Sequence, residues 1–293
     1  MQKPLIVITG KNGQLGWEFQ QIQAHYQHLY QFLFTGREDL DLNNPASVAP
    51  FFEKYQPQYF INCAAYTQVD KAETDQSAAF AVNAESVGEI AKACAAINCT
   101  LITISTDYVF NGLGTAPYLP NQATEPINYY GFSKQKGEEF ARINNKKTIV
   151  IRTSWVYSTH GNNFVKTMLR LMKERPSLNV VGDQVGAPTY AADLAAAIMQ
   201  MIYQLENGNR YFGIYHYSND ACISWYEFAV AIKEMAQLNC EVSAIPSSAY
   251  PTPAKRPNYS VLDKSSIQKD FGVSIVDWKE SLQKCMQQLL VNT

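Results

Sequence analysis

Short runs of β-branched and aromatic residues alternate with longer polar and apolar segments up to about residue 155. The apolar runs have the length of buried strands. Between them lie periodic segments rich in Ala, Glu and Lys, such as 78–97, which predict helices. This alternation predicts an α/β fold, a Rossmann-type doubly wound parallel sheet covered by helices on both faces. The predicted strands are Leu5–Thr9, Gln31–Thr35, Tyr59–Cys63, Leu101–Ser105 and Ile149–Thr153.

Beyond Trp155 the regular alternation of predicted strands and helices ends. Ser224 and Glu227 form a predicted capping box at the start of a helix. The segment 246–257 carries four prolines, so it must be extended or turned. We therefore expect a dinucleotide-binding domain over 1–157, to which 190–217 returns, and a smaller interleaved substrate-binding lobe from 158–189 and 218–293. Further helices are predicted over 163–174, 191–205, 224–237 and 277–290, and a return to the sheet over 213–217.

Composition narrows the class of protein. The 293 residues are 46% hydrophobic and 17% charged, as in ordinary soluble globular proteins. With 24 basic and 26 acidic residues the net charge is −2, which does not favour binding to nucleic acid or anionic lipid. The six cysteines form no CxxC pair, and the four histidines form no ligand cluster in sequence. This usage indicates a reducing cytosol rather than a disulfide framework or a zinc site.

Neither a targeting segment nor a membrane span is predicted. The chain enters its first apolar run without a basic leader, so no signal peptide is expected. The longest apolar stretch, 191–203, is interrupted by Asp193 and Gln200 and is too short to cross a bilayer. We expect a cytoplasmic protein.

A glycine-rich turn follows the first predicted strand. Gly10-Lys-Asn-Gly13-Gln-Leu-Gly16 opens a helix whose apolar face includes Leu15 and Phe19. The spacing is GxxGxxG, but it meets the same demands as the dinucleotide motif. Those demands are a tight turn, close backbone approach to a pyrophosphate and a helix N-terminus that attracts the anion. Glycine also serves ordinary sharp turns, so its place after the first strand is what favours cofactor binding.

Cofactor preference should depend on the end of the second strand, where an acid would bind the ribose 2′-OH of NAD. The sequence there is Thr35-Gly36-Arg37. An arginine without a carboxylate favours the 2′-phosphate of NADPH. Arg37 as a solvated loop residue is the alternative, and NADH use stays open.

Tyr130-Gly-Phe-Ser-Lys134 places a phenol and an ammonium one helical turn apart. The lysine should favour the phenolate and lower the tyrosine pKa, as proton transfer to a developing alkoxide requires. Thr106 stands at the end of the fourth predicted strand, where it could donate to a substrate carbonyl. A YxxxK pair alone is common by chance. Together with the glycine turn and Thr106 it predicts a reductase site.

Several longer motifs carry a resemblance to a known family. They resemble dTDP-4-dehydrorhamnose reductases over essentially the whole chain. The resemblance implies reduction of the C4 ketone of a dTDP-linked 6-deoxy-4-ketosugar to dTDP-L-rhamnose, for bacterial surface polysaccharide. The motifs are 105–110, 130–134, 152–157, 161–164, 183–189, 224–228 and 256–260.

The resemblance also implies residue roles. Tyr130 would protonate the C4 oxygen, Lys134 would tune Tyr130 and bind the nicotinamide ribose, and Thr106 would hold the C4 oxygen. Asp107 and Trp155 would line the sugar pocket, and the alternative for Trp155 is a core aromatic. The resemblance places Gly13, Gln14 and Leu15 at the cofactor diphosphate, and Asp41 and Leu42 near the adenosine. It also places along the cofactor the run that follows the predicted strand Tyr59–Cys63, namely Ala64, Ala65, Tyr66 and Thr67.

Other motif residues have structural interpretations. Asp70 and Glu73 are interpreted as a helix N-cap and its N3 partner. Arg256 could bind the nucleotide diphosphate or brace a loop. Family members often dimerise and have been linked to Mg²⁺, so a homodimer and magnesium are implied by resemblance alone. No motif places a metal.

Two other functions stay open. A nucleotide-sugar dehydratase or epimerase shares the fold, but a dehydratase usually has Glu directly after Thr-Asp, where this chain has Tyr108. A non-catalytic protein, like the regulatory subunit of methionine adenosyltransferase, would keep the cofactor site and relax the sugar pocket. The presence of Thr106, Tyr130, Lys134 and Trp155 argues against it.

Overall fold

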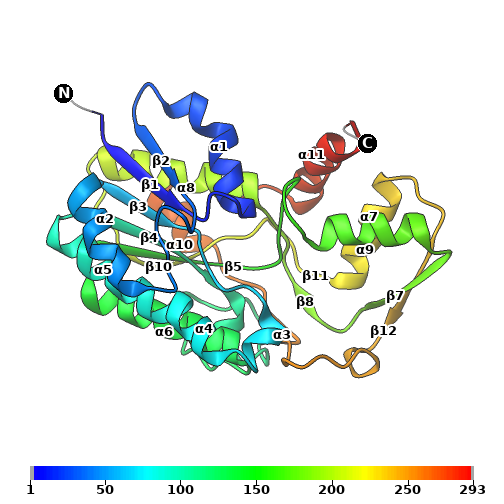
Figure 1. The fold of residues 1–293 in the computed structure, drawn as a ribbon. Helices are drawn as coiled ribbons and strands as arrows, with labels where there is room; N and C mark the ends of the chain where they lie inside the picture. Colours follow the sequence, from blue (N-terminus) through cyan, green and yellow to red (C-terminus); the bar gives the residue numbers. More distant parts are fainter. Residues whose placement is uncertain (1–2, 292–293) are drawn as a thin grey trace.

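The computed structural model describes residues 3–291, which form a parallel sheet beside a smaller lobe (Figure 1). The sheet has the strand order β10-β5-β4-β3-β1-β2. The chain runs outward from β1 to β2 and in the other direction from β3 to β10, so a topological switch point lies between β1 and β3. The predicted strands are confirmed within one or two residues as β1 (Leu5–Thr9), β2 (Gln31–Thr35), β3 (Tyr59–Asn62), β4 (Thr100–Thr106), β5 (Thr148–Thr153) and β10 (Gly213–His216).

Helices cover both faces of the sheet because its strands are apolar on both sides. In β1, Ile6 and Ile8 pack into one core, while Val7 between them packs into the other. One face carries α1 (Gln14–Tyr26), α8 (Ala191–Glu206) and α10 (Ser265–Phe271) (Figure 1). The opposite face carries α2 (Val48–Tyr55), α5 (Ser86–Ala96) and α6 (Tyr129–Asn144). The doubly wound α/β prediction is confirmed.

The helix predicted over 78–97 is interrupted by one wide turn. It consists of α4 (Gln76–Phe80), a π-helical turn over Ala81–Glu85, and α5. Asn83 in that turn accepts a hydrogen bond from the backbone N–H of Tyr66 at 2.9 Å and donates to Ser133 of α6 at 3.0 Å. A side chain at Gly137 would overlap the Asn83 carbonyl, so α6 lies directly against the turn. The π turn thus ties α6 to the loop after β3.

The smaller lobe has its own apolar core, to which three helices and the strand β7 contribute. Ser224 and Glu227 form the predicted capping box at the start of α9. The proline-rich segment holds only a short 3₁₀ turn over Ser247–Ala249. The lobe is built from α7 (Phe164–Glu174), β7 (Ser177–Val181), β8 (Val185–Gly186), β11 (Ile223–Ser224), α9 (Trp225–Met235), β12 (Glu241–Ile245) and α11 (Trp278–Val291).

The remaining elements are short. They are 3₁₀ turns at Pro45–Ser47 and Asp107–Val109, the helix α3 (Val69–Ala72), and the paired strands β6 (Val156–Tyr157) and β9 (Thr189–Tyr190). Within residues 3–291, no helix is long and apolar enough to cross a membrane.

Candidate active site

A cavity of about 750 Å³ opens at the carboxyl edge of the sheet, where α/β folds bind ligands. Its wall comes from the glycine turn, the ends of β3 and β4, the start of α6 and two tryptophans near the smaller lobe. Predicted site residues that line it are Gly10, Gly13, Gln14, Leu15, Arg37, Leu42, Ala64, Ala65, Thr67, Thr106, Asp107, Tyr130, Lys134 and Trp155.

The glycine turn is shaped by close backbone contacts. Gly10 has φ +70°, a conformation that favours glycine, and a side chain there would press on Ala64. Gly13 donates its N–H to the Gly10 carbonyl at 2.8 Å and precedes α1 without a side-chain cap. The first N–H groups of α1 are therefore available to an anion. Gly16 does not line the cavity. A side chain there would overlap the Gly10 carbonyl, so a glycine at this position lets α1 pack against the turn.

The loop after β2 carries charges of both signs. Arg37 lines the cavity, and so does Lys11 of the glycine turn. Lys11 pairs with Glu38 at 2.6 Å and Asp39 at 2.8 Å, and Asp39 also accepts from the Gly36 N–H at 2.9 Å. The carboxylates of Glu38 and Asp39 thus directly follow Arg37, close to the end of β2.

Two residues predicted along the cofactor lie outside the cavity. Asp41 turns back on its own loop and accepts from the Asn43 N–H at 3.0 Å, while its neighbour Leu42 lines the wall. The phenol of Tyr66 donates to Asp75 at 3.1 Å, so the side chain points away from the wall that Ala65 and Thr67 form. These contacts favour local bracing by both side chains.

Thr106, Tyr130 and Lys134 line one wall. Thr106 ends β4, and its hydroxyl donates to Asp107 at 2.9 Å. Lys134 lies one turn beyond Tyr130 in α6 and donates to the Ile104 carbonyl at 2.6 Å. The N-cap of α6 is Asn128, which accepts from the Gly131 N–H at 2.8 Å and so fixes where the helix begins. The three residues predicted as catalytic are therefore brought together.

Burial shifts the pKa values of both Tyr130 and Lys134. It raises the pKa of Tyr130, helped by the Asp107 carboxylate and opposed by the Thr106 hydroxyl. It also lowers the pKa of Lys134 to about 8, although Glu138 and Cys63 act to raise it. The sequence predicted a lowered pKa for Tyr130, and that direction is wrong. Desolvation of the phenol is the physical reason.

Asp107 faces the same cavity and is almost fully buried. Burial raises its pKa to about 6, against hydrogen bonds from Ser260 and Thr106. Its Oδ2 atom has no hydrogen-bond partner among residues 3–291. A buried carboxylate oxygen without a donor is costly, so Oδ2 is suited to receive a hydroxyl of a bound molecule.

Two tryptophans close the cavity near the smaller lobe. Trp155 has φ +47°, unusual for a bulky residue, and its ring stacks on Trp225 with 3.6 Å between centroids. A side chain at Gly186 would reach to 2.7 Å from the Trp155 ring. Strained residues held by their surroundings cluster at ligand sites. Trp155 thus belongs to the cavity wall, although it also packs at the edge of the lobe core.

The interpretation of Asp70 as an N-cap is wrong. Asp70 lies inside α3, whose N-cap is Gln68, and its carboxylate pairs with Arg256 through two hydrogen bonds. Arg256 also donates to the Ala254 carbonyl at 2.7 Å and does not line the cavity. Glu73 instead accepts from the Tyr129 N–H at 2.8 Å. Of the two roles considered for Arg256, these contacts favour loop bracing.

Several residues that line the cavity were not singled out from the sequence. Lys11 lies inside the glycine motif, and Trp225 lies inside the 224–228 motif, so both carried a signal. Asn162 follows a turn at Gly161, and Leu194 comes from α8. Nothing local marks Leu194, because only the packing of α8 on the sheet brings it to the wall.

No three His, Cys, Asp or Glu side chains within 3–291 gather as a metal site requires. Magnesium is therefore an implication of the family resemblance and has no ligand set in this part of the chain.

The sheet, the uncapped helix at its switch point and the Tyr–Lys pair together define a class. They are the framework of NAD(P)H-dependent oxidoreductases of the extended short-chain dehydrogenase type. The comparisons narrow this class to a family. A model of the RmlD substrate binding domain matches residues 3–291. This chain belongs to the dTDP-4-dehydrorhamnose reductase family.

Named relatives and solved structures agree over nearly the full length. A dTDP-4-dehydrorhamnose reductase from Aggregatibacter actinomycetemcomitans is 40% identical, covering 95% of this chain and 97% of the relative. The crystal structure of one from Clostridium acetobutylicum has a TM-score of 0.92 at 38% identity, covering 98% of this chain and 99% of that one. One from Bacillus anthracis, in complex with NADP, has a TM-score of 0.89 at 36% identity and full coverage of both chains.

The glycine turn gives a first prediction. In Gly16→Ala the new methyl would overlap the Gly10 carbonyl, so the turn must shift and dinucleotide affinity should fall at least about tenfold, or ~1.4 kcal/mol. Calorimetry with NADPH and NADH measures this. Gly88→Ala is the control, because its methyl meets only a Phe140 side chain at 3.3 Å. Unchanged affinity in Gly16→Ala would show that the turn does not contact the cofactor.

Proposed function

We propose that this protein reduces the C4 ketone of dTDP-4-dehydro-L-rhamnose to dTDP-L-rhamnose with NADPH. One observation carries the proposal most strongly. Thr106, Tyr130 and Lys134 line the same cavity as the uncapped N-terminus of α1. The sugar-facing wall would come from Asp107, Trp155 and Trp225, beside the lobe formed by 158–189 and 218–293. Relatives named for this reaction over nearly the whole chain support the choice of substrate.

NADPH, held by the N-terminus of α1 and by Lys134, would supply the hydride for C4. Thr106 holds the ketone oxygen by turning its hydroxyl from Asp107, to which it donates in the structure, toward that oxygen. Tyr130 donates a proton to the same oxygen. The raised pKa of Tyr130 keeps the phenol protonated at neutral pH, as an acid requires. Once the proton has left, the Lys134 ammonium stabilises the phenolate. The unpaired Oδ2 of Asp107 can accept a sugar hydroxyl and so orient the ring.

The preference for NADPH is part of the proposal. Arg37 and Lys11 line the cavity at the end of β2, where a 2′-phosphate would lie. Binding it would draw Lys11 away from Glu38 and Asp39, which would otherwise repel the phosphate. The relative from Bacillus anthracis was solved with NADP, which supports the same preference.

The structure favours reduction over dehydration. A dehydratase needs an acid to expel the C6 hydroxyl, and Tyr108 stands in the position usual for it. A ketone oxygen that receives a hydride at its carbon becomes basic enough to take a proton from a phenol, whereas a departing C6 hydroxyl needs a stronger acid. A phenol, with an ordinary pKa near ~10, is a poorer acid for that step than a carboxyl group. A non-catalytic role is disfavoured because Thr106, Tyr130, Lys134 and Trp155 all line the cavity.

The proposal is tested by following NADPH oxidation with dTDP-, UDP- and GDP-4-ketosugars. We expect stoichiometric oxidation with the dTDP-6-deoxy-4-ketosugar. A parallel incubation with dTDP-glucose and NAD should give no ketosugar by mass. Ketosugar formation at a comparable rate would identify a dehydratase, and binding without turnover on any sugar would identify a regulatory protein.

Removing the acid gives a second prediction. Tyr130→Phe should lower turnover by roughly two to four orders of magnitude, the usual contribution of a positioned acid, with little change in cofactor affinity. Tyr129→Phe is the matched control, since Tyr129 is its neighbour and does not line the cavity. If Tyr130→Phe keeps more than about a third of wild-type turnover when chemistry limits the rate, another group donates the proton.

The proposed phosphate contact gives a third prediction. Arg37→Ala should weaken NADPH binding by about 1.5–3 kcal/mol, the range for a hydrogen bond to a charged group, and leave NADH binding nearly unchanged. Arg142→Ala, an exposed arginine on α6 away from the cavity, should change neither. Equal losses for both cofactors would show that Arg37 does not recognise the 2′-phosphate.

A further inference from the structure

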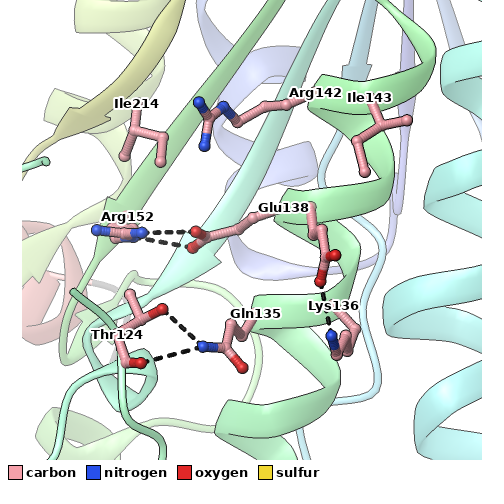
Figure 2. A pocket seen from close by; sticks show the side chains of 9 residues that line it. Thr124, Gln135, Lys136, Glu138, Arg142, Ile143, Arg152 and Ile214 are labelled. Carbon is pink, nitrogen blue, oxygen red and sulfur yellow. Dashed lines mark hydrogen bonds and ion pairs between the residues drawn. The ribbon is translucent and has the colours of Figure 1, made fainter.

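A buried ion pair lies one turn beyond the catalytic lysine. Arg152 of β5 donates to Glu138 of α6 through two parallel hydrogen bonds, at 2.9 Å from Nε and 2.7 Å from Nη2 (Figure 2). Arg152 is 2% exposed and Glu138 5%. The guanidinium is also held by the Pro120 carbonyl at 3.2 Å and lies 5.0 Å from the Phe110 ring centroid. The proposed reaction does not use this pair.

The carboxylate is tied to the catalytic strand as well. Ser105 of β4 donates its hydroxyl to Glu138, while Lys134 donates to the carbonyl of the preceding residue, Ile104. Residues four apart on a helix share a face, so Glu138 and Lys134 hold consecutive residues of β4. The next residue along that strand is Thr106. These two bonds therefore join the helix carrying Tyr130 to the strand that ends at Thr106, and the ion pair fixes Glu138 in that contact.

We propose that Glu138, fixed by Arg152 and Ser105, is a positioning residue that keeps Lys134 charged and in place beside Tyr130. The inference rests on the proposed function only for its kinetic consequence. Burial of Lys134 favours the neutral amine, and the Glu138 carboxylate one turn away is the largest influence that opposes it. A neutral lysine could not stabilise a tyrosinate, so the charge on Glu138 would sustain proton transfer.

Other groups around α6 leave Glu138 as the main anion facing Lys134. Cys63, directly after β3, faces it too, but burial raises the thiol pKa, so the group stays neutral. Behind Arg152, His216 of β10 is also neutral, because burial lowers its pKa to about 3. The remaining charged groups on elements against α6 either have their own contacts or are exposed. Asp70 pairs with Arg256, Glu89 with Lys92 and Lys71 with Asp75, Asp107 lies against Thr106 and Ser260, and Glu85 of the π turn is exposed.

A pH titration of the lysine itself tests the proposal. In protein labelled with ¹⁵N-lysine, the Lys134 resonance is assigned by its loss in Lys134→Met. The wild-type midpoint should lie near pH 8. Glu138→Gln has nearly the same shape without the charge, and its midpoint should fall by about one pH unit. Glu138→Asp keeps the charge and should stay closer to wild type. A Glu138→Gln midpoint equal to that of wild type would overturn the proposal.

The sign of the kinetic effect follows. Lys134 is charged below its pKa, so activity should be lost as pH rises through that value, and Glu138→Gln should lose it at lower pH. An inactive wild type would contradict the proposed function and leave the titration to decide this inference. In Glu138→Gln the Lys134 midpoint could fall while the pH at which activity is lost stays the same. The charge on Lys134 would then not be needed for the reaction, and the assignment of Glu138 as a positioning residue would fail.

Stability is separated from charge by two further variants. Glu138→Gln leaves the Arg152 cation buried alone, which is strongly destabilising. Should it not fold, Glu138→Gln is combined with Arg152→Gln and compared with Arg152→Gln alone, so that only the Glu138 charge differs, and the double variant should have the lower Lys134 midpoint. Asp193→Asn disturbs a different buried network, in which Asp193 accepts from Asn219 and Ser281. It should lower the melting temperature and leave the Lys134 midpoint unchanged. Equal midpoints in all variants would show a purely bracing role.

Discussion

The end of β4 against α6 is the contact on which the site depends. Lys134 and Glu138 each bond to this strand, and Arg152 anchors Glu138 from β5. Because these contacts are buried, water cannot compete for them and their geometry is fixed. The strand β4 ends at Thr106, one residue after Ser105. The Thr106 hydroxyl is therefore placed beside Tyr130 without any flexible segment between them.

A second set of contacts joins the glycine turn to the segment that enters the smaller lobe. Asn163 donates to Gln14 at 3.0 Å, and His160 bonds to the Asn12 carbonyl at 3.1 Å and stacks on Trp17. Beneath them, Glu18 of α1 accepts from Ser158 at 2.6 Å. The glycine turn and the tryptophan wall of the cavity are therefore held in one frame, as the proposed reaction between two bound molecules would require.

The sequence predicts what is local. Five strands were placed because each is a short apolar run between polar segments, and the glycine turn and Tyr130-to-Lys134 spacing are visible within a few residues. Contacts between distant segments were not predictable: Arg256 meets Asp70 across 186 positions. The direction of the Tyr130 pKa was missed for a related reason, since it depends on desolvation in the folded chain. Carboxylates after β2 turn back toward Lys11, which the strand pattern could not show.

Transfer of a label tests the central claim most directly. The protein is given the dTDP-6-deoxy-4-ketosugar and NADPH carrying deuterium on the transferable nicotinamide position. The account predicts one deuterium at C4 of the product, one equivalent of NADP⁺ formed, and dTDP-L-rhamnose as the sugar nucleotide. Deuterium at another carbon, or product formed without net oxidation of NADPH, would contradict reduction at C4 by this site.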